Sequence, residues 1–241
     1  VGYRTVFLLP AILYLRFKKR KIILDIPTPF KTYLLEQKSS KKKLKNIFYT
    51  FLLKLFGSIT LRTANLVIQY DTEGFPFNIF GTSNFLYTAN GIDVISYNCK
   101  KNKKKIYNNQ LNLLFVGSTS FWHGLDNCIH AIHRYQIKSS IKINLHIVGN
   151  VEKDLHDQLT KIILNYKLES QIIFHGILKG EELDKLYDMS NIGIGSIGLE
   201  KIKSKYRSEL KAREYCAVGL PFIASSIDRD FPSSIKFRFI V

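Results

Sequence analysis

The sequence predicts an α/β chain of two domains built on parallel sheets. With 241 residues, 46% of them hydrophobic, it is long enough for one or two domains with a sizeable core. From Leu111 onward, short apolar runs alternate with longer segments of helical period, which is typical of strand and helix units around a parallel sheet. Residues 1–110 carry 19 lysines and arginines against five acids, and residues 111–241 carry 17 against 14, which indicates two parts with different partners.

The second half, residues 111–241, is predicted to be a doubly wound nucleotide-binding domain. Its strands are expected at 113–116, 143–148, 172–174, 192–194 and 221–224, and the helices between them at 124–137, 152–166, 180–189 and 209–218. The second helix repeats apolar residues along one face that can lie on a sheet: Leu155, Leu159, Ile162, Ile163 and Tyr166.

The first half, residues 1–97, is less regular than the second. Residues 21–26 and 66–70 are typical of buried strands, and two prolines end the first of them. A basic amphipathic helix is expected over 41–57, ending at Gly57. The lysine-rich residues 98–110 are interpreted as a linker. We expect the sequence to be cut at both ends, so that both domains lack a part.

The basic helix has two interpretations. Its apolar residues stand beside a lysine cluster: Leu44, Ile47, Phe48, Phe51, Leu52 and Phe56 beside Lys41, Lys42, Lys43 and Lys45. Such a helix lies on an anionic membrane surface or, more commonly, covers a sheet. The basic first half attracts anionic lipid or nucleic acid, or its lysines simply cover a solvated surface. No apolar run is long enough to span a bilayer.

Loops that follow strands are the places for ligands in a doubly wound sheet. The first such loop, residues 117–124, contains two glycines and three hydroxyl residues and opens a helix whose unpaired amides can hold phosphate. Any turn between a strand and a helix favours glycine, so an ordinary turn is the alternative. The next loop, Gly149 and Asn150, is interpreted as such a turn.

A second candidate is the helix at 209–218. Lys211 and Arg213 stand near its amino end, where the helix dipole also favours a diphosphate, and Glu214 can accept hydrogen bonds from ribose hydroxyls. The alternative is a surface helix on which Glu209, Lys211, Arg213 and Glu214 form salt bridges with one another.

Several other chemistries are excluded or disfavoured. Gly193, Gly195 and Gly198 match G-x-G-x-x-G, but late in the domain and without the acidic residue about 20 positions on that a dinucleotide site needs. There is no P-loop, no H-E-x-x-H and no G-x-S-x-G motif. His130 and His133 are interpreted as packing or surface residues, not metal ligands. Three cysteines without zinc or disulfide spacing favour a reducing compartment.

Five segments in order resemble retaining glycosyltransferases of the GT-B fold, in the family-four group that builds bacterial capsular and other surface polysaccharides. They are residues 23–28, 90–93, 113–117 with 122–126, 174–176 with 182–187, and 208–221, the last following the pattern S-x-L-K-x-R-E-Y-x-A-x-G-x-P. The resemblance implies two Rossmann-like domains, each doubly wound around a parallel sheet, with the amino-terminal one incomplete and on the acceptor side.

The resemblance also implies a donor site. It places the diphosphate at the amides of Gly117 and Ser118, near His123, Gly124 and Lys211, with the amides of Leu210 and Lys211 completing the cradle; it places the ribose at Glu214 and the base near Gly176 and Ile177. Many relatives carry Arg and Lys where this chain has Ser118 and His123, and many carry a glutamate where it has Tyr206. It implies no catalytic side chain that we can name, no metal and no other cofactor.

We therefore expect a hexosyltransferase-type enzyme that moves a sugar, with retention, from a nucleoside diphosphate sugar to a growing or lipid-linked glycan. The expected location is cytoplasmic, with peripheral attachment to the inner face of the plasma membrane if the basic helix binds lipid. We expect no nucleic acid partner, and little turnover from these residues alone. Two rivals remain: a catalytically silent nucleotide-sugar-binding fragment, and a basic nucleic-acid-binding protein.

Overall fold

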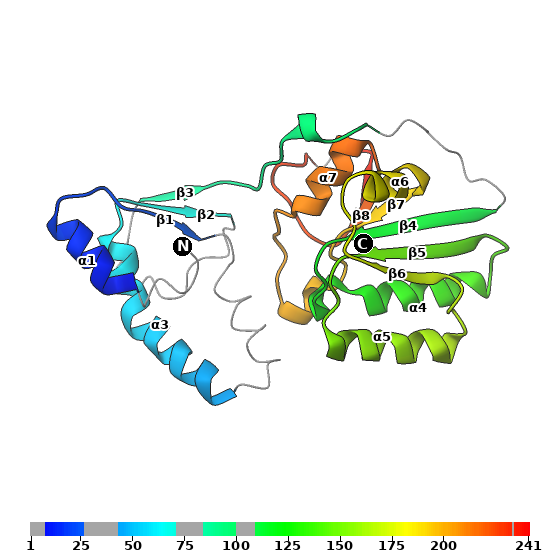
Figure 1. The fold of residues 1–241 in the computed structure, drawn as a ribbon, viewed down its shortest axis with the longest axis horizontal. Coiled ribbons are helices and arrows are strands. Elements are labelled where there is room, and N and C mark those ends of the chain that lie inside the picture. The colour runs from blue at the N-terminus through cyan, green and yellow to red at the C-terminus, as the bar shows by residue number, and fades with distance from the viewer. Residues whose placement is uncertain (1–7, 27–42, 71–83, 100–108, 233) are drawn as a thin grey trace. The chain divides into compact units, whose positions relative to one another are not determined.

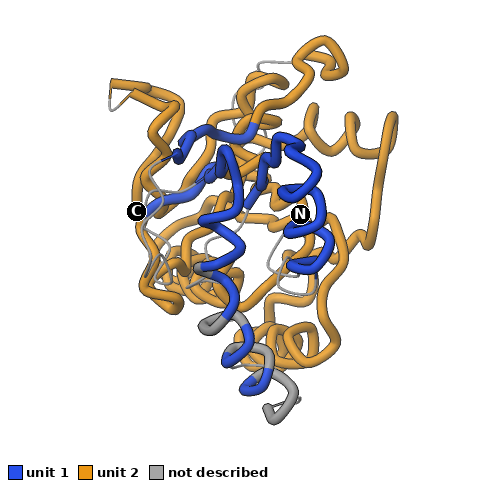
Figure 2. Tube along the Cα trace, turned by 90° about the vertical axis from the view of Figure 1, so that its left-hand side faces the viewer, with its two compact units in different colours: residues 1–90, 206–208 blue, residues 91–205, 209–241 orange. Residues whose placement is uncertain are grey.

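The computed structural model describes residues 8–26, 43–70, 84–99, 109–232 and 234–241 (Figure 1). Two compact units make up the chain: unit 1 comprises residues 1–90 and 206–208, and unit 2 comprises residues 91–205 and 209–241 (Figure 2). The predicted linker, residues 98–110, lies mostly outside the described residues, so the predicted limits of 1–97 and 111–241 stay predictions.

Unit 2 contains a six-stranded, fully parallel sheet with the order β6-β5-β4-β7-β8-β9. Its strands are β4 (Gln110–Val116), β5 (Lys142–Val148), β6 (Ile172–Gly176), β7 (Ile192–Ile194), β8 (Phe222–Ala224) and β9 (Arg238–Ile240). The chain runs outward from β4 through β5 to β6, returns to the other side of β4 at β7, and continues to β9. This is the doubly wound arrangement that the sequence predicts.

Helices cover both faces of this sheet (Figure 1). They are α4 (Leu125–Gln136), α5 (Lys153–Tyr166), α6 (Glu181–Met189) and α7 (Leu210–Val218), with short 3-10 turns η2 (Val94–Ser96), η3 (Phe121–His123) and η4 (Leu199–Ile202). Alternate residues of β4 belong to two apolar clusters: Leu113 and Phe115 pack with α4 and α5, and Leu114 packs with α6 and α7. The predicted apolar face of α5 is confirmed, because Leu159 and Ile163 are buried in the first cluster.

Unit 1 contains a three-stranded parallel sheet of order β1-β2-β3, formed by Ile23–Ile26, Leu66–Gln69 and Phe85–Tyr87. Helices α1 (Leu9–Phe17) and α3 (Lys43–Thr63) pack with it around a small core. The buried members of that core are Ile12, Ile22, Leu24, Ile26, Leu61 and Val67. The two strands predicted for the first half are therefore present, and β3 is an additional strand that the sequence pattern did not predict. Residues 27 and 28, which end the first segment of the family resemblance, lie outside the described residues.

The predicted end of the basic helix at Gly57 is wrong. Helix α3 continues to Thr63, and its last turns carry Leu61, which is 2% exposed, into the core of unit 1. The Thr60 hydroxyl donates to Phe56 O at 2.9 Å within the same stretch. A glycine inside a helix costs about 1 kcal/mol relative to alanine, and burying a leucine side chain contributes about 2 kcal/mol. Burial thus outweighs the local preference of glycine to end the helix.

The apolar face of α3 divides into two parts. Leu52 and Phe56 pack against the core of unit 1, as expected of a helix that covers a sheet. Ile47, Phe48 and Phe51 are 67%, 63% and 58% exposed. Lys41 and Lys42 lie outside the described residues, and the side chains of Leu44, Lys43 and Lys45 are not described. Within the described ranges, no helix has the length and hydrophobicity that crossing a lipid bilayer requires.

The hydroxyl of Tyr215 in α7 contacts both β4 and β7 at the junction between these two strands. These strands pair only at Leu113 with Ile192 and at Leu114 with Gly193. The Tyr215 hydroxyl accepts from Val116 N–H at 3.1 Å, and its oxygen lies 3.0 Å from Leu114 O and 3.1 Å from Ile194 O. The ring fills the space over Gly193, where an added Cβ would lie 2.6 Å from Tyr215 Cδ2.

Replacing Tyr215 with Phe should lower the free energy of unfolding by about 1–3 kcal/mol, because the partly buried amide of Val116 loses its Tyr215 partner while the ring still packs. Urea unfolding followed by the fluorescence of Trp122, the only tryptophan, measures this in unit 2. The control Tyr135→Phe changes an exposed tyrosine of α4 and should cost less than about 0.5 kcal/mol. Equal effects of the two variants would show that the hydroxyl does not hold the junction.

Candidate functional site

The candidate site lies where the winding direction of the unit 2 sheet reverses. Strands β4 and β7 are neighbours, yet their following loops lead to opposite sides, the first through α4 to β5 and the second through α7 to β8. In open α/β sheets, ligands bind beyond the carboxyl ends of the strands at such a switch point. The loop after β4, residues 117–124, and the amino end of α7 both lie at this end of the sheet.

Main-chain contacts fix the first part of the loop after β4. Gly117 has φ +133°, and its N–H donates to Val148 O at 2.9 Å. Thr119 donates from its N–H to Asn150 O at 2.9 Å. Ser118, between them, is exposed. The loop thus holds the predicted residues Gly117 and Ser118 beside the turn after β5, with the Ser118 side chain open to solvent.

His123 is buried and belongs to the 3-10 turn that follows. The N–H of Ser120 donates to His123 Nδ1 at 2.8 Å, and the N–H of His123 donates back to Ser120 O at 2.9 Å. The ring packs between Trp122, at a centroid distance of 3.8 Å, and Phe115, at 5.3 Å. Because Nδ1 accepts a hydrogen bond, the neutral ring carries its proton on Nε2. His123 therefore has a structural role in shaping the loop.

Gly124 brings the loops after β4 and β7 together. It begins α4 with φ +75°, and an added Cβ would lie 2.7 Å from Gly198 N. Gly198 meets it from the other side, where a Cβ would lie 2.9 Å from Gly124 Cα. Ile197 N–H donates to His123 O at 3.0 Å in the same contact. The glycines of the G-x-G-x-x-G match thus serve close packing, since Gly193 meets Tyr215 and Gly198 meets Gly124.

Lys211 places an ammonium beside the loop after β4. A Cβ added to Gly117 would lie 3.7 Å from Lys211 Cε and 3.9 Å from Nζ. The Nζ atom lies 3.9 Å from the centroid of the Phe115 ring and is buried without a hydrogen-bond partner in the described structure. Burial lowers the pKa of Lys211 to about 8, although the charges of Glu209 and Glu214 act in the opposite direction. A buried cation without an anion can bind one.

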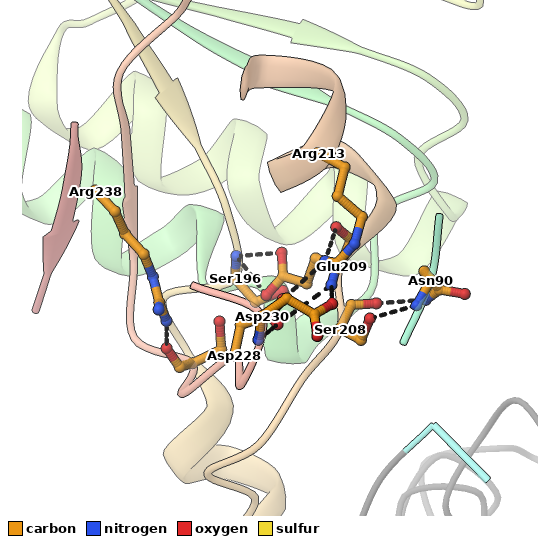
Figure 3. Close-up of polar contacts among 9 residues, drawn as sticks. Asn90, Ser196, Ser208, Glu209, Arg213, Asp228, Asp230 and Arg238 are labelled. Carbon is orange, nitrogen blue, oxygen red and sulfur yellow. Dashed lines mark hydrogen bonds and ion pairs between the residues drawn. The ribbon is translucent and has the colours of Figure 1, made fainter. Parts of the chain in front are cut away.

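The alternative interpretation of the 209–218 helix, in which its charged residues form salt bridges with one another, is wrong for the described structure. Arg213 instead forms a buried pair with Asp228, at 2.8 and 3.2 Å, and also bonds Asp230 (Figure 3). Glu209 accepts from Ser196 N–H with its carboxylate, at 3.0 Å for Oε2 (Figure 3). These contacts fasten the amino end of α7 to the loops after β7 and β8. The partners were missed because they follow other strands, far from the helix in sequence.

Glu214 is held by two tyrosine hydroxyls. Tyr97 donates to Glu214 Oε1 at 3.1 Å, and Tyr187 of α6 donates to Glu214 Oε2 at 3.3 Å. Burial, together with the nearby Glu214 charge, raises the pKa of both tyrosines. No sequence signal pointed to Tyr97, whereas Tyr187 belongs to a segment that carries the family resemblance.

The remaining predicted residues are at the surface. Gly176 ends β6 with φ +68° and is exposed, and its carbonyl accepts from Gly149 N–H at 2.7 Å. Ile177 and Leu210 are 69% and 50% exposed. The structure therefore brings Gly117 next to Lys211, while no described contact joins Glu214 or Gly176 to that pair.

His130 and His133 both pack against Tyr166. His130 Nδ1 lies 2.9 Å from the Tyr166 hydroxyl, and His133 stacks on the same ring at 3.9 Å, so the packing interpretation is confirmed. Among the described residues, no group of three or more metal-ligating side chains is found. The described groups support the binding of an anion by main-chain amides and the ammonium of Lys211. The carboxylate of Glu214, on the same helix, can accept hydrogen bonds from hydroxyl groups.

Comparison with known proteins gives a family and a fold. Residues 96–236 match the family described as glycosyl transferases group 1. No curated protein matches the chain in sequence. Among solved structures, Anabaena HepE in complex with UDP-glucose is 14% identical with a TM-score of 0.64, over 99% of this chain and 62% of HepE.

Two further structures are similar. Sucrose-phosphate synthase from Thermosynechococcus elongatus is 16% identical, with a TM-score of 0.59 over 85% of this chain and 50% of that one. A TarM variant from S. aureus, in complex with Fondaparinux, alpha-GlcNAc-glycerol and UDP, is 17% identical, with a TM-score of 0.58 over 78% and 36%. The chain thus spans less than two thirds of the length of these proteins. The likeness confirms the predicted GT-B class of parallel-sheet α/β fold.

Replacing Lys211 with Met should raise the free energy of unfolding at pH 7 by about 1–2 kcal/mol, because it removes a buried, unpaired charge. It should also weaken pyrophosphate binding at least about tenfold. In the original chain, stability should rise between pH 8 and 10.5, since only the unfolded lysine still binds its proton there. The Met variant should lack this rise.

Urea unfolding across pH and calorimetric titration with pyrophosphate measure these effects. Lys161→Met, at an exposed position of α5, serves as the control and should change neither quantity. A destabilised Lys211→Met variant would show that the ammonium contributes to the fold instead of to a ligand site.

Proposed function

The chain belongs to the glycosyl transferases group 1, a family of glycosyltransferase enzymes, and on this premise we propose that unit 2 binds the donor, a nucleoside diphosphate sugar. The observation that carries the proposal is the ammonium of Lys211 at the switch point of the sheet, which is buried beside Gly117 with no hydrogen-bond partner among the described residues. The complex of HepE with UDP-glucose supports this class of donor.

The proposed donor site uses main-chain amides for most of its contacts with the diphosphate. Amides of Gly117, Ser118 and Leu210 donate to the phosphates, and Lys211 supplies an amide and the ammonium. The amino end of α7 adds its dipole. Residues His123 and Gly124 shape the loop.

The nucleoside is proposed to extend from the diphosphate toward α6. Glu214 accepts the ribose hydroxyls, since its carboxylate lies one turn inside α7 and faces Tyr187 of α6. The backbone of Gly176 and Ile177, exposed at the end of β6, faces the base.

The proposed reaction transfers the sugar to an acceptor hydroxyl with retention of configuration. The bond between the anomeric carbon and the diphosphate breaks, the acceptor oxygen bonds to that carbon from the same face, and the acceptor proton leaves with the diphosphate. Lys211 and the α7 dipole stabilise the charge that develops on the departing diphosphate. The acceptor, a growing surface polysaccharide or lipid-linked glycan, is assigned to unit 1.

A membrane surface is proposed as a further partner of unit 1. The exposed fractions of Ile47, Phe48 and Phe51 favour this partner, because their part of α3 is not packed on the sheet. The sequence also places four lysines at 41, 42, 43 and 45, just before these residues. Apolar side chains beside cations suit an anionic lipid surface.

A panel of nucleoside diphosphate sugars tests the donor proposal. At least one should raise the melting temperature of the chain, because a ligand that binds only the folded state stabilises it. Replacing Glu214 with Ala should weaken that binding by about 1–3 kcal/mol, since a charged hydrogen-bond acceptor is lost. Calorimetry measures the affinity, with Glu169→Ala, an exposed acid, as the control.

Absence of binding by every sugar nucleotide would overturn the donor proposal. Binding that Glu214→Ala leaves unchanged would remove only the ribose role. Sugar transfer by the full-length gene product separates a working enzyme from the silent-binder rival, and salt-dependent binding to oligonucleotides would favour the nucleic-acid rival.

Co-sedimentation with anionic vesicles tests the membrane proposal. The chain should sediment at low salt and be released as salt rises, because each lysine near the surface contributes about 1 kcal/mol. A fluorophore at position 51 should be quenched from the acyl region. Phe48→Ser should weaken sedimentation, whereas Phe239→Ser, at an exposed aromatic of unit 2, should not. Sedimentation without quenching would reduce the contact to surface electrostatics, and no sedimentation would end the idea.

A further inference from the structure

We propose that Tyr97 and Tyr187 are positioning residues that orient the Glu214 carboxylate toward the ribose of the donor. The inference rests on the proposed function, because it assigns residues to the ribose end of the same site. Its basis is the convergence of two hydroxyl donors, one on each oxygen of a single carboxylate.

The geometry restricts the carboxylate in a way that one contact would not. Tyr97 bonds Oε1 at 3.1 Å, and Tyr187 bonds Oε2 at 3.3 Å. The terminal torsion of a glutamate is broad when the group is free. With a donor on each oxygen, rotation would break at least one bond, so the plane of the carboxylate is set. A carboxylate has about four lone-pair directions, and two remain for a ribose diol.

Among the described residues, the cations close to Glu214 in sequence do not hydrogen-bond its carboxylate, whereas the two tyrosines do. Arg213, the next residue in α7, directs its guanidinium to Asp228 and Asp230. Lys211 interacts with Glu214 electrostatically, but its Nζ has no hydrogen-bond partner among the described atoms. The two hydroxyls therefore replace hydrogen bonds that the Glu214 carboxylate would make to water if it were not partly buried between α6 and α7.

The two tyrosines are held by different parts of unit 2. Tyr187 is 3% exposed, and its ring packs edge-on near Tyr215 at a centroid distance of 6.4 Å. Tyr97 follows η2, in the segment just after the boundary at Asn90 and Gly91. Burial raises the pKa of each phenol, so both remain hydrogen-bond donors at neutral pH.

The test compares ribose with dideoxyribose. The nucleoside diphosphate that the chain binds best, chosen among UDP, GDP, ADP and CDP, and its 2′,3′-dideoxy form are titrated by calorimetry. In the original chain the ratio of their dissociation constants should be roughly 10 to 100, the value of hydrogen bonds to a charged group. In the double variant that carries both Tyr97→Phe and Tyr187→Phe, the ratio of dissociation constants should fall about threefold to tenfold. The affinity for the dideoxynucleotide should change less than about twofold.

Tyr166→Phe serves as the matched control. It removes a hydroxyl that is also hydrogen-bonded, but from α5 on the other face of the sheet, and should leave the ratio unchanged. A purely structural role of the tyrosine pair would weaken both ligands equally and overturn the inference. If the double variant does not fold, Tyr97→Phe alone decides, because Tyr97 is only partly buried.

The outcomes separate this inference from the proposed function. Failure of the original chain to bind any of the four nucleotides would count against the donor site itself. Binding with a ratio near one would leave the donor site in place and overturn the positioning role, since no ribose bond would then exist to be oriented.

Discussion

The hydroxyl of Tyr215 is the contact on which the switch-point end of the sheet depends. Strands β4 and β7 share only two paired positions before their following loops diverge, and this divergence creates the switch point. The hydroxyl joins the carboxyl ends of both strands through Val116, Leu114 and Ile194. Because Tyr215 is part of α7, the same contact fixes the helix against the sheet. Lys211, four residues earlier on the same helix face, is thereby placed at the loop after β4.

Two cations of α7 show how a structural charge differs from one available to a ligand. Arg213 is buried, and its planar guanidinium is satisfied by two carboxylates and the carbonyl of Glu209. Lys211 is two residues earlier, yet its ammonium has no hydrogen-bond partner among the described residues and lies over the face of the Phe115 ring. A fold selected for stability alone would pair or replace such a group. A buried ammonium that is open to pairing at the switch point is what a binding site for an anion requires.

The sequence predicted elements better than contacts. Strand β7 was predicted at its observed limits, 192–194, and the four helices of unit 2 within about one residue, because their apolar periodicity directly reflects the two faces of the sheet. The end of α3 was missed because the burial of Leu61 is a tertiary effect that overrides Gly57. Lys211 and Glu214 were predicted as site residues, but their surroundings depend on Phe115, Tyr97 and Tyr187, which are remote in sequence.

The composition of the loop after β4 explains why so much depends on one lysine. Its eight residues, Gly117 to Gly124, include no lysine or arginine, so that loop offers amides, hydroxyls and one histidine. The Nδ1 atom of that histidine already accepts the Ser120 N–H, and its ring is packed between aromatic neighbours. For a diphosphate at this position, Lys211 would therefore supply the positive charge of a side chain, and the amino end of α7 would supply the remaining stabilisation. The positive charge that this end of the sheet can offer an anion is thus concentrated on one side chain that lies beside Gly117 and over the ring of Phe115.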